Sequence, residues 1–306
     1  MGRLIDKARV TKVRVSDSTD STDSTDSTVE VDTRADRLAV EEPLQIRVDG
    51  TDLSTTMRTP GHDIELIHGL LHAEGVISHR SDVSTARYCA GAVGPNNENT
   101  YNTLDVSLTP PDLPDAPEVP GLTPPPSALP SLPVRSVTTN SACGVCGTRS
   151  IDDLMKQKRY TLTPVRPDPT DIIAMPQALR GAQEAFRKTG GIHAAGAFTA
   201  DGRPLVVRED VGRHNAADKV IGALLLDDRL PGDVDPSDPD RAVYLVMSSR
   251  ASFELVQKAV LAGFSGLVAV SAATSLAVDM ARQSGLLLTG FTRDDRFNLY
   301  SGELAS

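Results

Sequence analysis

Two of the three cysteines in this 306-residue chain lie in the segment SACGVCGTRS, with two residues between them and a glycine directly after each. Cys143 and Cys146 in this spacing could bind zinc, form a redox dithiol or carry sulfur. Structural zinc needs four ligands, and Cys89 is the only other cysteine. A thioredoxin-like dithiol follows a strand and opens a long helix, whereas a proline-rich stretch precedes this pair. A mobile loop suits a thiolate that must reach both a donor and an acceptor of sulfur, but spacing alone leaves these chemistries open.

A zinc deaminase is a further alternative. The tripeptide HAE at His72–Glu74, followed later by CGVC, resembles the H-x-E and P-C-x-x-C signature of those enzymes. Ala142 takes the place of the proline, and His72 comes at the end of its expected helix rather than at the start. We therefore rank the deaminase below a sulfur carrier and expect no metal ligands.

A second group of polar residues lies in LVVREDVGRHNAADKVIG, from Leu205 to Gly222. A short strand leads into Glu209 and Asp210, and His214 follows just before a helix. Acidic residues, a glycine, an arginine and a histidine between a strand and a helix are typical of a site. We expect Asp210 and His214 to hold a ligand rather than to perform acid–base chemistry.

A third group depends on the elements of the last third of the chain. RAVYLVM, GLVAV and LLLTGF read as buried strands, and ASFELVQKAVLAG and LAVDMARQSG read as helices between them. Short connections imply right-handed crossovers and a parallel sheet. The loops SSR, SAATS and FTRDDR then share the carboxyl edge of that sheet, where α/β proteins bind ligands.

This edge has the chemistry of an anion site. Ser249 or Ser252, and Thr274 or Ser275, are candidate caps, so two helices present free backbone N–H groups there. Arginines of the loops add guanidinium groups; they are Arg250, Arg293 and Arg296. Such a combination suits phosphates. The sequence has neither GxxxxGK[ST] nor GxGxxG after a strand, so another arrangement must bind any nucleotide.

The chain divides into five expected segments. Residues 1–34 hold a basic strand and an acidic, disordered DST repeat, and 35–108 form a small α+β unit. In that unit we expect a helix with Thr59 as its N-cap and Gly75 as its stop. A proline-rich loop, a mobile cysteine loop with a short helix, and a large α/β domain follow, at 109–133, 134–160 and 161–306. An acidic stretch at 227–240 should be a solvated loop.

Composition excludes several classes of protein. The net charge of −10 disfavours nucleic acid as a partner. No apolar run is long enough to span a bilayer, and three cysteines are too few for a disulfide framework. We therefore expect a cytoplasmic protein without membrane association.

Five motifs together resemble the formate dehydrogenase accessory sulfurtransferase family, FdhD: CGVCG, EDVGRHNAADKVIG, SSRASFELVQKA, VSAATSLAVDMA and GFTRDDRFNLY. The resemblance covers most of the chain from about residue 35. It implies an α/β protein with a cytidine-deaminase-like, three-layer C-terminal domain around a parallel or mixed sheet, plus a smaller α+β N-terminal unit. Cys89 matches none of these motifs, and we read it as a buried or incidental thiol.

The resemblance also implies an activity. Such proteins take persulfide sulfur from a cysteine desulfurase and pass it to the molybdenum cofactor, bis-molybdopterin guanine dinucleotide, for formate dehydrogenase. By this likeness Cys143 carries the persulfide, Cys146 assists or is dispensable, and the protein is a homodimer. A carrier that binds the cofactor without chemistry remains an alternative. The residues expected to bind the cofactor are Asp210, His214, Ser249, Arg250, Phe291, Thr292, Arg293, Asp294, Asp295 and Arg296.

Overall fold

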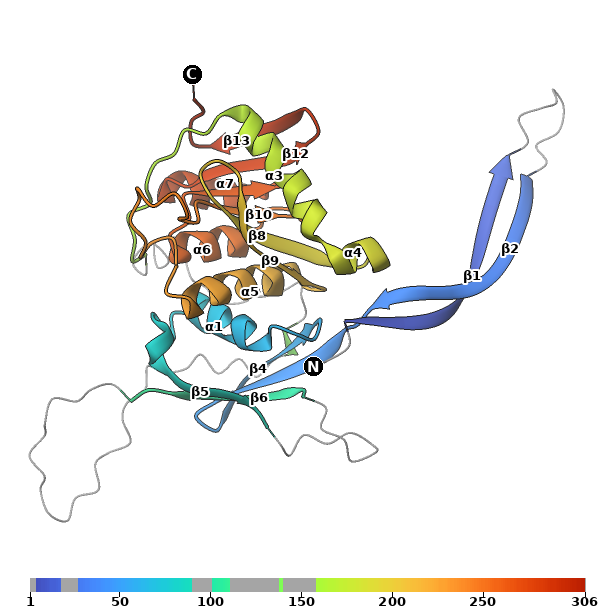
Figure 1. Ribbon diagram of the computed structural model, residues 1–306, viewed down its shortest axis with the longest axis horizontal. Coiled ribbons are helices and arrows are strands. Elements are labelled where there is room, and N and C mark those ends of the chain that lie inside the picture. The colour runs from blue at the N-terminus through green and yellow to red at the C-terminus, as the bar shows by residue number, and fades with distance from the viewer. Residues whose placement is uncertain (1–3, 18–26, 90–100, 111–137, 140–157, 306) are drawn as a thin grey trace, which may run out of the picture.

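The computed structural model describes residues 4–17, 27–89, 101–110, 138–139 and 158–305. Cys143, Cys146 and most of the expected proline-rich loop, cysteine loop and DST repeat lie outside the described residues. The rest forms two sheets with helices between and around them, and a long hairpin that extends from the body (Figure 1).

The larger sheet has six strands in the order β13-β12-β11-β10-β8-β9. Neighbouring strands β10, β11 and β12 are parallel, and β8, β9 and β13 pair antiparallel to their neighbours. The bounds are β8 His193–Phe198, β9 Pro204–Asp210, β10 Tyr244–Met247, β11 Gly266–Ala269, β12 Leu287–Arg293 and β13 Arg296–Ser301. The predicted parallel core is therefore correct, and it is embedded in a mixed sheet.

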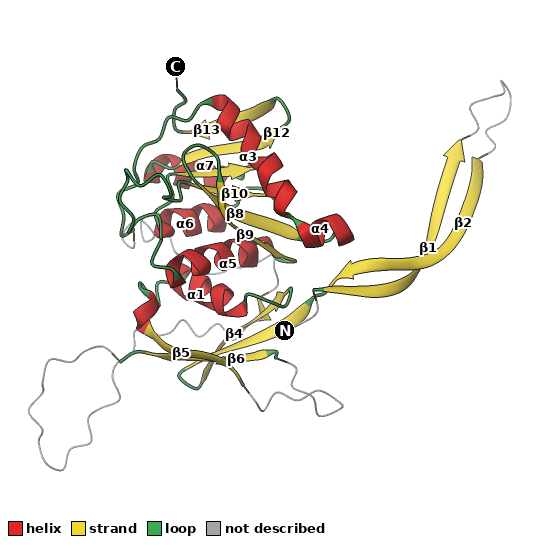
Figure 2. Cartoon of the chain, in the orientation of Figure 1, coloured by secondary structure: helices red, strands yellow, loops and turns green. Residues whose placement is uncertain are grey.

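Helices cover both faces of this sheet (Figure 2). One face packs on α5 (Arg213–Leu226), α6 (Phe253–Ala262) and α7 (Ser275–Ser284), and the other on α3 (Pro169–Ala182). Successive strand residues alternate between the two cores: Leu245 and Met247 join the first, Tyr244 and Val246 the second. The expected three-layer α/β domain is confirmed. A short helix α4 (Glu184–Thr189) follows α3.

The smaller unit is a five-stranded sheet in the order β5-β6-β3-β4-β7. Its helix α1 (Asp63–Ala73) lies between this sheet and α5 (Figure 1). The other bounds are β3 Glu42–Val48, β4 Thr51–Arg58, the 3₁₀ turn η1 Arg80–Asp82, β5 Val83–Tyr88, β6 Thr103–Leu108 and β7 Thr138–Thr139. The prediction of a smaller α+β unit is confirmed.

The start of α1 differs from the prediction. The helix begins at Asp63, after Gly61 and His62 at φ values of 102° and 58°. Thr59 does not cap it, because the Thr59 hydroxyl accepts a hydrogen bond from the backbone N of Val211, 3.1 Å away in the other domain. Gly75 follows the end of the helix at φ 73°, as expected of a helix stop.

The first two strands form the projecting hairpin. β1 (Ile5–Asp17) and β2 (Ser27–Ala39) pair antiparallel from Ile5↔Ala39 to Asp17↔Ser27. The expected segment boundary after residue 34 falls inside β2. The sequence signal for β2 is weak, because its few apolar residues alternate with charged ones and most are solvent-exposed.

The sequence predicted a solvated loop at 227–240, but part of this acidic stretch is buried. Leu230 is fully buried in the main core, and Asp233 accepts a hydrogen bond from the Tyr160 hydroxyl at 2.8 Å. Arg229 pairs with Asp238 at 3.3 Å, and Arg203 pairs with Asp240. These contacts attach the loop to the domain despite its composition.

Two glycines set the close approach of α1 to α5. A Cβ on Gly69 would lie 1.9 Å from the backbone O of Asp218, and a Cβ on Gly222 would lie 1.8 Å from that of Glu65. The backbones of the two helices are therefore in direct contact, and this contact joins the smaller unit to the larger domain.

We expect Gly69→Ala to lower the free energy of unfolding by about 3 kcal/mol, because the added methyl group must push α1 away from α5. Gly181→Ala on α3 is the matched control, since a Cβ there meets nothing within 4 Å. That control should gain about 0.5–1 kcal/mol from its higher helix propensity. Urea unfolding measures both; equal stabilities of the two variants would contradict the expectation.

Candidate functional site

A cavity of about 410 Å³ opens at the carboxyl edge of the larger sheet. We call it the edge cavity. The ends of β10, β11 and β12 contribute Ser248, Val270 and the segment Thr292–Asp294 to its wall. Two of the three loops that the sequence assigned to one edge, together with Val270, which follows β11, therefore line one open cavity of a size that suits small ligands.

The opposite wall comes from α3, α4 and the start of β8. Arg180, Gln183 and Phe186 line it from the helices, and His193 lines it from the first residue of β8. Val211, just after β9, completes this side. The cavity thus lies between the strand ends and the α3–α4 layer.

The strand side of the cavity is held by hydrogen bonds within the sheet. The hydroxyl of buried Thr292 lies 3.1 Å from that of Thr289, and Phe291 N donates to Ser271 O at 3.0 Å. Ser248 Oγ accepts from Ala194 N at 2.9 Å. Phe291 sits at φ 52°, a strained value for a bulky residue. Phe291 is exposed, whereas the next two residues, Thr292 and Arg293, line the cavity.

Cations gather around the cavity. Burial, and then the charge of Arg250, lowers the pKa of Arg213. Burial, and then the charge of Arg213, lowers the pKa of His193. Arg213 Nε is buried without a hydrogen-bond partner among the described residues. Arg180 and Arg293 line the cavity, and the charge of Arg213 acts on the lining residue His193, so an anion would be stabilised at this edge.

His214 lies between two helices. Its Nε2 atom is 3.0 Å from a Glu254 carboxylate oxygen and 3.2 Å from Ser252 Oγ. Burial and the nearby cations, Lys258 first, lower its pKa. One turn further along, Asp218 on α5 pairs with Lys258 on α6 at 2.6 Å. His214 therefore fixes α5 against α6, and it is not part of the cavity lining.

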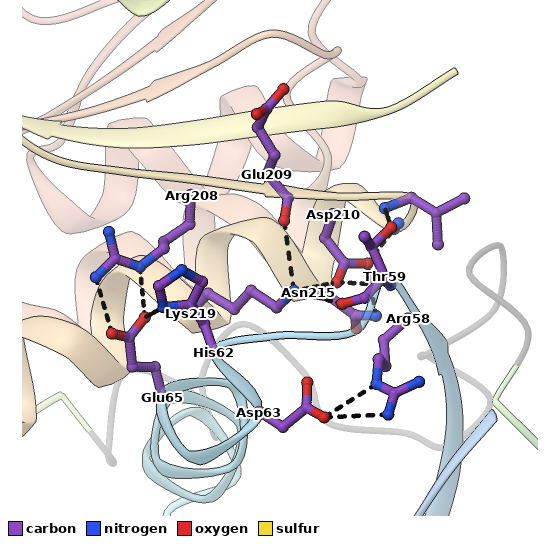
Figure 3. A network of polar contacts seen from close by, with 12 residues as sticks. Arg58, Thr59, His62, Asp63, Glu65, Arg208, Glu209, Asp210, Asn215 and Lys219 are labelled. Carbon is purple, nitrogen blue, oxygen red and sulfur yellow. Dashed lines mark hydrogen bonds and ion pairs between the residues drawn. The ribbon is translucent and has the colours of Figure 1, made fainter. Parts of the chain in front are cut away.

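Asp210 is the centre of a buried network between the two units (Figure 3). Its carboxylate pairs with Lys219 Nζ at 2.7 Å and accepts hydrogen bonds from Thr59 N, Gly212 N and Asn215 Nδ2 at 3.1, 2.8 and 3.1 Å. Every bond that a buried carboxylate needs is supplied by the chain. Asp210 thus places the Val211–Arg213 turn beside the cavity.

The preceding residue points to the other side of β9. Glu209 accepts hydrogen bonds from Ala185 N and Phe186 N, at 2.9 and 2.8 Å, and so occupies the start of α4. Adjacent strand residues point to opposite faces, so one strand end holds both layers that surround the cavity.

Two further ion pairs lie nearby: one is within the smaller unit, and the other joins that unit to β9 (Figure 3). Arg58 is fully buried and pairs with Asp63 at 3.1 Å, and Asp63 also accepts from Tyr88 Oη at 2.9 Å. Arg208 on β9 holds Glu65 on α1 through two hydrogen bonds, one of 2.8 Å. Burial alone would raise the pKa of Glu65, but Arg208 and His62 together lower it to about 2.

The residues expected from the sequence to bind cofactor are thus divided. Thr292, Arg293 and Asp294 line the cavity, and Phe291, Asp295, Arg296, Ser249, Arg250, Asp210 and His214 do not. Ser249 is buried, and its hydroxyl donates to Arg250 O at 3.1 Å. Arg296 is exposed and lies opposite Arg293 in the backbone register of β12 and β13. Cys143 and Cys146 lie outside the described residues.

Sequence reasoning missed Gln183, Phe186 and His193. His193 follows two glycines at the start of a strand, a pattern that could have drawn attention to it. Gln183 and Phe186 stand in an ordinary helical stretch, and only their three-dimensional neighbours mark them.

The described residues contain no group of three or more His, Cys, Asp or Glu side chains arranged to hold a metal ion. His72 of the deaminase-like tripeptide is buried in the last turn of α1, where burial lowers its pKa to about 4. Cys89 is half-buried and unpaired. No helix in the described ranges is both long and apolar enough to cross a membrane.

Comparison with known proteins identifies the family. Residues 39–305 match the model of the FdhD/NarQ family, so this chain belongs to that family. The chain is 56% identical over 305 residues to the sulfur carrier protein FdhD of Corynebacterium efficiens, covering 99% of this chain and 100% of that protein. It is 48% identical over 273 residues to the protein of the same name from Nocardia farcinica, with 88% of each chain covered.

A solved structure shares the fold. The crystal structure of a proposed formate dehydrogenase accessory protein from Desulfotalea psychrophila superposes with a TM-score of 0.61 over 96% of this chain and 97% of that one. The two sequences are 17% identical, so this likeness concerns the fold alone.

The pairing of Glu65 with Arg208 predicts a loss of stability in acid. Because the pKa of Glu65 falls from 4.5 to about 2 on folding, its contribution is complete above pH 4.5 and is lost as the pH falls towards 2. The stability lost between pH 4.5 and 2 amounts to about 3 kcal/mol of unfolding free energy. In Glu65→Gln, the free energy of unfolding should therefore change less with pH over this range. Glu303→Gln removes an exposed ion-pair partner and should leave the slope unchanged, and a steep slope retained in Glu65→Gln would contradict the assignment.

Proposed function

We propose that this protein is a sulfur carrier that accepts persulfide sulfur from a cysteine desulfurase and transfers it to the molybdenum cofactor, bis-molybdopterin guanine dinucleotide, for formate dehydrogenase. Relatives that match it almost end to end are named sulfur carrier proteins, and the chain has the Cys143–Cys146 pair. The structural observation that carries the proposal is the edge cavity, whose cations suit the phosphates of a nucleotide-bearing substrate.

The Sγ atom of Cys143 is the proposed carrier of the transferred sulfur. Its thiolate attacks the outer sulfur of the donor's persulfide, the sulfur–sulfur bond breaks, and the donor cysteine leaves as a thiolate. A reduced cofactor would then supply an electron pair that bonds to the outer sulfur; the sulfur–sulfur bond breaks, and its two electrons stay on Cys143, which leaves as a thiolate. Cys146 assists or is dispensable.

The described chain ahead of the cysteines ends close to the Asp210 network. Thr138 and Thr139 pair with Thr55 and Thr56 on β4. Thr56 Oγ1 donates to Asn215 Oδ1 at 3.4 Å, and Asn215 donates to Asp210. Cys143 follows Thr139 by four residues (143 − 139), which span at most about 14 Å when extended. This chain path supports a thiol that serves the edge cavity.

The cofactor enters this proposal as a bound substrate. Arg293, which lines the cavity, is the group best placed to take its phosphates, since charge-assisted hydrogen bonds are the strong ones. The partners are a cysteine desulfurase as donor, formate dehydrogenase as recipient and a second copy of the chain as a homodimer, all in the cytoplasm.

A carrier that binds the cofactor without chemistry is the second candidate. The observation in its favour is that the cavity and its cations belong to the described residues, whereas the thiols do not. It differs from the first candidate in one respect: it needs no cysteine.

Incubation with a cysteine desulfurase and cysteine should add one sulfur mass to the peptide that contains Cys143. Cys143→Ala should abolish that adduct and the ability of the protein to support an active formate dehydrogenase. Peptide mass spectrometry and formate oxidation in a strain that lacks the native protein measure the two effects.

The Cys143→Ser Cys146→Ser double variant separates the two candidates. Loss of formate dehydrogenase activity with unchanged cofactor binding supports the sulfur carrier. Full activity in the double variant would overturn it in favour of the passive carrier.

Arg293→Ala should weaken binding of guanosine diphosphate by roughly tenfold or more, because a hydrogen bond to a charged phosphate contributes about 1.5–3 kcal/mol. Arg296→Ala should retain most of the affinity, since Arg296 is exposed on β13 and does not line the cavity. Isothermal titration calorimetry measures both, and an equal loss in the two variants would place the anion outside the edge cavity.

A further inference from the structure

The projecting hairpin has a face of valine side chains near its outer end. In its antiparallel register Val13 lies opposite Val31 and Val15 lies opposite Val29. Side chains at alternate positions of a strand share a face, so these four valines form one apolar surface. Each of them is between 57% and 64% exposed.

The other face of the projecting hairpin is charged. Lys12 lies opposite Asp32, and Arg14 lies opposite Glu30 with 3.9 Å between the charged groups of that pair. Opposite charges directly across two strands stabilise their pairing and remain hydrated. Water therefore suits this face, whereas the valine face gains stability when another surface covers it.

The body of the same chain does not provide that cover. At the base of the hairpin Val40 N donates to Leu4 O at 3.1 Å, and α4 packs against β2. The outer end extends away from the body (Figure 1). A hairpin of two strands is marginally stable on its own in water, and a long exposed strand with apolar residues is a template for contact with another chain. The valine face therefore has the properties of an interface with a second molecule.

The size of this face favours a reciprocal interface. Each strand has 13 residues, so the hairpin is about 44 Å long and about 10 Å wide, which gives roughly 440 Å² for one face. One hairpin on an unrelated protein, or two hairpins packed on each other, would bury about 900 Å² in total, less than stable interfaces bury. Two copies that each place a hairpin on the body of the other would bury about 1,800 Å², which is the usual size of a stable interface.

Charge favours the same arrangement. The strands β1 and β2 contain six basic and five acidic residues, a net charge of +1. From residue 40 onward the chain contains 24 basic and 33 acidic residues, a net charge of −9. Two bodies of this charge repel each other where they meet directly, whereas the hairpin can approach either body without that repulsion.

We propose that the projecting hairpin is a dimerisation arm, and that each copy of the chain packs its valine face on the body of a second copy. A two-fold axis relates the two contacts, so both hairpins are used in the same way. Val13, Val15, Val29 and Val31 form the apolar centre of each contact. This inference rests on the homodimer of the proposed function and names the surface that forms it.

The double variant Val13→Lys Val31→Glu tests this surface in the full chain. The new side chains lie directly opposite each other, so an ion pair like that of Lys12 and Asp32 replaces an apolar pair and the hairpin stays paired. The dissociation constant of the dimer should rise roughly 100-fold or more, because four valine contacts are lost per dimer. Sedimentation equilibrium should give twice the chain mass of 32.5 kDa for the unaltered protein and the single-chain mass for the variant.

The double variant Lys12→Glu Asp32→Lys is the matched control. It exchanges two charges on the opposite face, keeps all four valines and should remain a dimer. Urea unfolding of both variants should match that of the unaltered body, which separates loss of the interface from loss of the fold. Equal dissociation constants for the two double variants would overturn the dimerisation arm, and so would an unaltered protein of single-chain mass.

A photo-crosslinker identifies what the valine face contacts. With p-benzoylphenylalanine in place of Val31, a mixture of isotope-labelled and unlabelled copies should give cross-links from one copy to peptides of the other from residue 40 onward. Cross-links confined to one copy, or only between the two hairpins, would overturn the proposed contact. A dimer that persists in Val13→Lys Val31→Glu would refute the arm and leave the homodimer standing. The persulfide adduct on Cys143 is measured separately, so sulfur carriage can stand where this inference fails.

Discussion

The buried carboxylate of Asp210 is the interaction on which the arrangement of the site depends. It sits where β9 ends, and it is neutralised by Lys219 and bonded to the backbone of Thr59 and Gly212. Removal of one partner from such a pair leaves an uncompensated buried charge, at a cost of about 3–5 kcal/mol. Such an ion pair adds little net stability to the fold, and its main effect is to fix the positions of the groups that it joins. Thr59, whose backbone N and O bond to Asp210 and Lys219, connects the pair to the smaller unit.

Because consecutive residues of a strand point to opposite faces, the end of β9 also positions the helix layer on the other side of the sheet. Glu209 and Asp210 are consecutive, so their side chains leave β9 on opposite faces, one towards the start of α4 and the other towards α1 and α5. A displacement of the smaller unit that moved this strand end would move Phe186 as well. The glycine contact between α1 and α5, with Gly69 and Gly222 against carbonyl groups, makes such a displacement costly.

The sequence predicted the part of the fold in which local pattern and burial agree. The apolar strands that became β10 to β12 and their connecting helices carry strong periodic signals, and their order dictates the shared edge. Thr59 shows where this reasoning stops: its preference for capping a helix is real, but its hydroxyl is used by Val211, 152 residues away. Gln183 is a second case, because nothing in its neighbours along the chain distinguishes a buried, unpaired amide from an exposed one. The long hairpin is a third: a strand was expected within residues 1–34, but the few apolar residues of β2 are mostly exposed and gave no sign of its length.

The same network also accounts for how one edge could serve two chemical demands. A nucleotide needs rigid donors, and in the proposed function Ser248 and Arg293 at the strand ends supply them. A sulfur-carrying thiol must instead meet a donor protein and an acceptor in turn, so it cannot belong to those walls. In the proposed function the two demands fall on different segments: the residues that line the cavity come from α3, α4 and the strand ends, and the cysteines follow the short strand β7 in the sequence. In the proposed function, binding and transfer therefore belong to different segments of the chain.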